Sequence, residues 1–123
     1  MKYAHLNYDD PSIEIIENAL FIVKNIRFDN LSSQENGAMS RTAGAVLKKL
    51  EAKSDKITPA NLAAMCSAVS TVSVVLKDNE DLYRQLFVSP SVELHEYIQL
   101  LESAASALEA WALQIGLQVH PTL

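Results

Sequence analysis

Cysteine, glycine, proline and aromatic residues are all scarce in this chain of 123 residues. Cys66 is the only cysteine, which excludes an internal disulfide and fits a reducing compartment. With only 3 Gly and 4 Pro, the composition is that of a globular protein and not of a disordered one. Aromatic residues make up 7% of the chain, so the core has to be built mostly from aliphatic side chains and alanine.

An excess of positive charge and a secretory leader are missing as well. The net charge is −5, which provides no general attraction to nucleic acid or to anionic membranes. The N-terminus has no basic region followed by an apolar run and a small-residue cleavage site. We therefore expect a cytoplasmic protein, and the length suits a single domain over residues 1–123.

Helix signals recur along the chain, whereas strand patterns are nearly absent. Asp10-Pro11 starts a first helix, because Asp can cap free backbone N–H groups and Pro suits the first helical position. The apolar stripe that follows carries this helix to about residues 28–30. Ser32 followed by Glu35 is a capping box, which predicts a second helix from there to about Lys53.

The second half of the chain repeats these signals. Thr58-Pro59 starts a third helix, residues 78–87 form a loop or a short helix, and Ser89-Pro90 caps the last and longest helix, over about residues 91–117. Short links between successive helices favour antiparallel neighbours. The sequence therefore predicts an all-α protein, a single bundle of four to five helices with a long C-terminal helix.

The predicted last helix repeats apolar residues every seven positions. Its stripe contains Leu94, Leu101, Leu108 and Ile115, with Trp111 beside them. This spacing is typical of a helix in a bundle or a coiled coil. From the sequence alone the stripe fits equally well in the core of one chain or in the seam of a homodimer.

The predicted third helix contains the longest uncharged run of the chain, 20 residues from Ile57 to Leu76. A run of this length just spans a bilayer. However, its Ser and Thr content, its one-sided apolar spacing and its symmetric flanking lysines favour a buried helix over a membrane span. Ala64 and Ala68 belong to a ridge of small residues over which another backbone can approach, either the small segment 103–107 of the last helix or a second copy.

Part of this run also resembles the helix-turn-helix of bacterial repressors. The resemblance implies a DNA-binding regulator that uses residues 46–76. Three features depart from the pattern: Ser67 stands where a turn glycine is usual, the spacing to Thr71 is one residue short, and residues 73–76 offer no side chain that reads a base edge. The matching residues are Leu62, Ala63, Ser67, Val69, Thr71, Val72 and Ser73.

The sequence predicts no catalytic, cofactor-binding or metal-binding residues. Cys66 lies in the most apolar segment, where burial raises the pKa of a thiol and makes it a poor nucleophile. The histidines His5, His95 and His120 are scattered and lack the spacing of paired metal ligands. No glycine-rich phosphate loop occurs.

Together these features predict a non-enzymatic helical module for protein–protein interaction, in a regulatory or accessory role. A second copy is the favoured partner, another protein is the next, and nucleic acid is not expected; the alternative is the DNA-binding regulator. The residues predicted for self-association are Leu94, Leu101, Leu108, Trp111, Ile115, Ala64 and Ala68.

Overall fold

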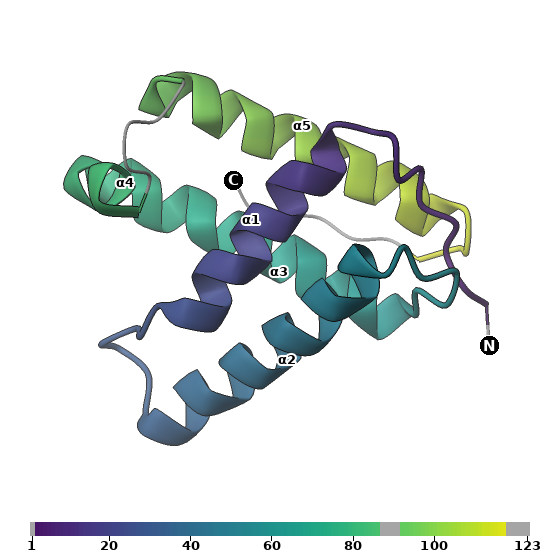
Figure 1. Ribbon diagram of the computed structural model, residues 1–123, viewed down its shortest axis with the longest axis horizontal. Coiled ribbons are helices and arrows are strands. Elements are labelled where there is room, and N and C mark those ends of the chain that lie inside the picture. Colours follow the sequence, from purple (N-terminus) through teal and green to yellow (C-terminus); the bar gives the residue numbers. More distant parts are fainter. Residues whose placement is uncertain (1, 87–91, 118–123) are drawn as a thin grey trace.

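The computed structural model describes residues 2–86 and 92–117 of the chain. Its long helices alternate in direction along the molecule (Figure 1). The predicted all-α bundle with antiparallel neighbours is therefore confirmed. The described residues form five helices: α1 (Ser12–Asn25), α2 (Ser33–Glu51), α3 (Pro59–Asp78), α4 (Glu80–Leu86) and α5 (Leu94–Leu113).

Capping boxes start α2, as predicted, and also α3, where the sequence predicted only the Thr58 cap followed by Pro59. The Ser32 hydroxyl accepts a hydrogen bond from the Glu35 backbone N–H, and the Glu35 carboxylate accepts one from the Ser32 N–H. Thr58 and Asn61 make the same reciprocal pair in front of α3. Each box satisfies backbone donors that the first helical turn leaves free, which is why both helices begin where the sequence predicted.

The end of α1 differs from the prediction. The helix ends at Asn25 instead of near residues 28–30, and Ile26 is already extended. The side chain of Asn36 on α2 accepts a hydrogen bond from the Phe28 N–H at 2.8 Å and donates one to the Phe28 carbonyl at 3.0 Å. These bonds hold the chain in a turn, so the apolar stripe does not continue as helix.

The prediction for the last helix was also too long. Gly116, with φ of +72°, adopts the left-handed conformation, and the Leu117 N–H bonds back to the Ala112 carbonyl. This is a glycine C-cap, and it ends α5 before residue 117. At the other end the described helix begins after Glu93, and the predicted cap Ser89-Pro90 lies outside the described residues.

α3 lies at the centre of the bundle. Figure 1 shows α1 crossing α3, with α2 on one side of α3 and α5 on the other. The Leu, Met and Val side chains of its inner face are almost fully buried: Leu62, Met65, Val69, Val72 and Leu76. Three neighbouring helices thus cover three sides of α3, and the fourth side faces outward.

The segment before α1, residues 2–11, forms an N-terminal arm that is hydrogen-bonded to the loop between α2 and α3. The Ala4 N–H donates to the Ile57 carbonyl at 2.8 Å, in an isolated antiparallel bridge, and both residues are fully buried. The Tyr8 hydroxyl donates to the Ser54 carbonyl. The arm therefore fixes the start of α3 relative to α1.

Candidate functional site

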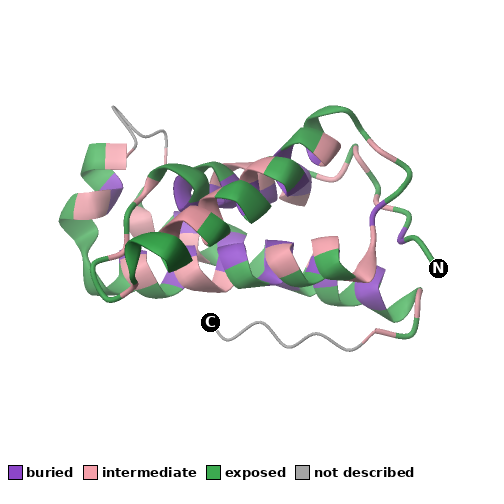
Figure 2. Cartoon of the chain, turned by 90° about the horizontal axis from the view of Figure 1, so that it is seen from below, coloured by how far each residue is buried: buried purple, intermediate pink, exposed green. Residues whose placement is uncertain are grey.

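The outward side of α3 is an uncharged surface. Only 44% of the most apolar 18-residue stretch of α3 is buried, and Val74 is 47% exposed. Figure 2 shows buried and exposed residues alternating along the helices. We call this surface the neutral face of α3, and it comprises the exposed or half-buried residues Ala60, Ala63, Ala64, Ser67, Ser70, Thr71 and Val74.

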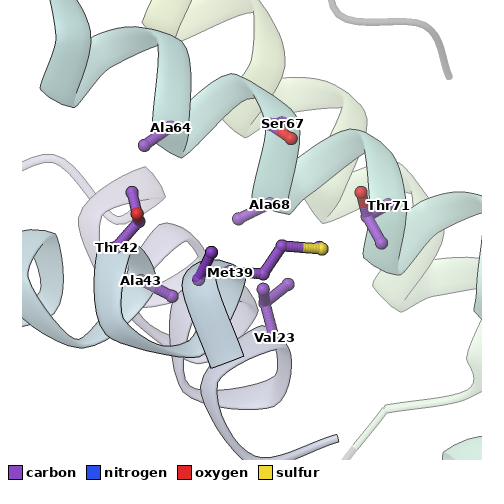
Figure 3. Close-up of a pocket in the computed structure, with 9 residues that line it drawn as sticks. Val23, Met39, Thr42, Ala43, Ala64, Ser67, Ala68 and Thr71 are labelled. Atoms are coloured by element: carbon purple, nitrogen blue, oxygen red, sulfur yellow. The ribbon is translucent and has the colours of Figure 1, made fainter. Parts of the chain in front are cut away.

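A groove of about 220 Å³ lies between this face and α2. The two helices converge at the loop that joins them and diverge from there (Figure 1). In Figure 3, Ala64 and Ala68 of α3 face Thr42 and Met39 of α2, with Val23 of α1 beneath them. Methyl-sized side chains on α3 are too short to fill the space that opens as the helices diverge, and the groove is the result.

A second hollow, of about 410 Å³, continues the groove toward the turn between α1 and α2. The two hollows share Met39 and Thr71, and the second also has Phe28, Leu31 and Val74 in its wall. No Lys, Arg, Asp or Glu lines either hollow. The neutral face and the groove thus form one continuous surface that is suited to an apolar or weakly polar partner and not to an ion.

The helices on either side of the neutral face differ in net charge. On one side, α2 and the loop after it hold five of the ten cationic residues against three carboxylates, Glu35, Glu51 and Asp55, so this side is net positive. On the other side, α5 has the exposed carboxylates Glu96, Glu102 and Glu109, and the sequence has no Lys or Arg after Arg84. The cationic residues are Arg41, Lys48, Lys49, Lys53 and Lys56.

The predicted interaction residues divide into two groups. Leu101 and Leu108 are fully buried and Trp111 is 6% exposed, so the seven-residue stripe of α5 belongs to the core of one chain. Leu94 and Ile115 are half-buried and pack against the same core. Ala64 and Ala68, in contrast, line the groove. The small-residue ridge therefore faces α2 and not, as the sequence also allowed, the small segment of α5.

Sequence reasoning missed the exposed part of the neutral face. Ala63, Ser67 and Val74 were not predicted to take part in self-association. The signal was available in the uncharged run of 20 residues itself: the part of it that forms a helix has to show an uncharged face wherever that helix is not covered.

The turn that the helix-turn-helix resemblance places at Ser67 does not form. Residues 59–78 are one uninterrupted helix, so there is no turn at Ser67. The residues that resembled a recognition helix are divided between the buried side of α3, as for Val72, and its neutral face, as for Thr71.

Cys66 carries the most reactive functional group of α3, a thiol. The fold lowers the reactivity of this thiol by burying it. The residue is 7% exposed, and burial, followed by the charge of Glu109, raises the pKa of its thiol to about 11. The group is therefore protonated near neutral pH, as expected from the sequence. In the described part of the chain, no three His, Cys, Asp or Glu side chains lie together as a metal site.

The aromatic residues of α5 contribute to the core. Tyr97 packs on Tyr83 of α4 with ring centroids 5.6 Å apart, and the Tyr83 hydroxyl donates to the Val92 carbonyl at 2.7 Å. Burial raises the pKa of Tyr97 to about 12, with the Tyr83 hydroxyl adding to it, against the lowering effect of a hydrogen bond with Asn18.

By length and composition α3 is the one described helix that could cross a membrane, a test that core helices of soluble proteins also pass. Comparison of the chain with protein-family models, with curated proteins and with solved structures finds no match in any of the three.

Proposed function

We propose that this chain is a non-enzymatic helical protein–protein interaction module that forms a homodimer through the neutral face of α3. The observation that supports this proposal most strongly is the exposure of that face, which presents Ala, Ser, Thr and Val side chains and no charge. A regulatory or accessory role in the cytoplasm fits a module of this kind.

The small side chains of the face favour another helix as its partner. Helix axes pack at about 8–10 Å, and the shorter distances need small residues at the contact. Ala60, Ala63, Ser67 and Ser70 repeat at three- and four-residue spacing, so they form one stripe along the helix. A partner helix that lies on this stripe removes apolar surface from water without stripping any charged group of its hydration.

The proposal predicts the mass of the particle in solution. At micromolar concentration, light scattering should give twice the chain mass of 13.5 kDa. Ser67→Arg places a charge on an exposed position in the middle of the face, so the variant should fold normally and be monomeric. Folding is checked by circular dichroism.

Ser103→Arg is the matched control, because Ser103 is also an exposed helical serine and lies on α5, away from the neutral face. It should remain dimeric. A monomeric wild-type protein, or a dimer that Ser67→Arg leaves intact, would overturn the proposed function.

A further inference from the structure

We infer that the second copy packs with the two-fold axis parallel to α3, so that α2 of each copy faces α5 of the other. This inference rests on the proposed function, because it specifies how two neutral faces meet. It adds an electrostatic contact on each side of the two α3 helices. These contacts are made by the exposed edges of α2 and α5, which are not part of the core of one chain.

If the two α3 helices lie along each other, two neutral faces can meet with two-fold symmetry in two ways, both with the axis in the plane of contact. If the axis runs along α3, the two α3 helices are parallel and each α2 lies opposite the α5 of the other copy. If the axis runs across α3, the two α3 helices are antiparallel, α2 lies opposite α2, and α5 lies opposite α5. The flanking helices, which differ in charge, therefore decide between the two arrangements.

Charge favours the first arrangement. The α2 side is net positive, because its cations, among them the exposed Arg41, Lys48 and Lys56, outnumber its carboxylates. The α5 side carries the exposed carboxylates Glu102 and Glu109 and no Lys or Arg. With the axis along α3, cations face carboxylates on both edges of the interface. With the axis across α3, cations face cations and carboxylates face carboxylates, which like-charge repulsion disfavours.

The charges on both sides also lie beside the first half of α3. The Lys49 ammonium donates to the Asn61 side chain at 2.8 Å, which places the end of α2 beside the first turn of α3. The charge of Glu109 contributes to the raised pKa of the Cys66 thiol, which places this part of α5 beside the first half of α3. An axis along α3 preserves these positions along the helix, so Lys48 and Lys56 of one copy approach Glu109 of the other.

Interface area requires the flanking helices as well. A stable interface buries about 800 Å² on each partner. A helix face about 30 Å long and about 10 Å wide provides less than half of that area. The edges of α2 and α5 therefore have to join the contact, and the charges on them have to be compatible.

Charge reversal tests the arrangement. Lys48→Glu with Lys56→Glu turns two attractive edges into repulsive ones, so the dimer dissociation constant at low salt should rise roughly tenfold. Adding Glu102→Lys and Glu109→Lys to the same chain restores opposite charges across both edges. This fourfold variant should return to the wild-type dissociation constant, measured by sedimentation equilibrium.

Net charge needs its own control. Combining Lys48→Glu and Lys56→Glu with Asp9→Lys and Glu14→Lys restores the wild-type net charge at exposed positions that line neither the neutral face nor the two hollows. This variant should stay as weak as the double reversal.

The alternative arrangement gives a different result. With α2 opposite α2, reversing α2 in both copies leaves like charges facing each other, so the dissociation constant barely changes. A dimer that the reversal does not weaken would overturn the arrangement and leave the proposed function standing. A wild-type protein that is monomeric at every concentration overturns both.

Discussion

Ser73 is the one fully buried polar residue in the described part of the chain, and its hydroxyl has no hydrogen-bond partner there. A buried donor without a partner costs about 1–3 kcal/mol, because it gives up its bonds to water. Nothing in the pattern of α3 distinguishes Ser73 from Ser70, which lies on the neutral face. Which hydroxyl is buried depends on where α1 and α5 contact the helix, and the sequence does not show that.

Ser73→Ala should therefore raise the free energy of unfolding by about 1 kcal/mol more than Ser70→Ala does. Both substitutions replace serine by alanine inside the same helix, so the gain in helix propensity cancels between them. Urea unfolding of the two variants measures the difference. Equal stability of the two variants would show that the Ser73 hydroxyl is satisfied in solution.

Because of the Cys66 thiol, the free energy of unfolding should depend on pH in the alkaline range. Burial and the charge of Glu109 raise its pKa to about 11 in the folded chain, above its value in the unfolded chain. The unfolded state therefore loses this proton first, and stability falls as pH rises from about 9 toward 11. In Cys66→Ala the decline in unfolding free energy over that range should be shallower; an identical pH profile would contradict the assignment.

At the scale of single helices, the sequence predicted the starts better than the ends. The starts of α2 and α3 depend on local pairs, Ser32 with Glu35 and Thr58 with Asn61, which can be read from neighbouring residues. The end of α1 depends on Asn36, a residue of the next helix, and that contact exists only in the folded chain. Gly116 is an exception, because a glycine after an apolar helix is a recognisable stop signal that the prediction did not use.

The small residues of α3 show that two sides of one helix differ in how well they tolerate a long, charged side chain. Ala68 is 3% exposed, so the charge of Ala68→Arg is buried without a partner and should cost about 3 kcal/mol or more. Ala64 is half-buried at the groove, so a long side chain there can reach water, and Ala64→Arg should cost about 1 kcal/mol.

Thermal or urea unfolding compares the two variants directly. Ala64→Arg should unfold close to the wild-type midpoint but lose the dimer, whereas Ala68→Arg should unfold at a clearly lower temperature or urea concentration. Similar stability of the two variants would mean that α3 is rotated relative to α2.

At the scale of the whole molecule, the sequence predicted a bundle but not which surface of it stays open. The stripe of Leu101 and Leu108 was compatible with a core or with a seam, and the fold uses it as core. The seam that we propose comes instead from the central helix, because α1, α2 and α5 cover only three of its sides. That arrangement depends on how the helices cross, and periodicity alone does not specify crossing.

Cross-linking at Ser67 tests the central claim most directly. A two-fold axis along α3 brings the two Ser67 positions of a dimer close together, so Ser67→Cys, made in a Cys66→Ala background, should oxidise to a disulfide-linked dimer at low protein concentration. Ser103→Cys in the same background should remain mostly monomeric on a non-reducing gel. Cross-linking of Ser67→Cys no faster than that of Ser103→Cys would contradict the claim that the neutral face of α3 is where two copies meet.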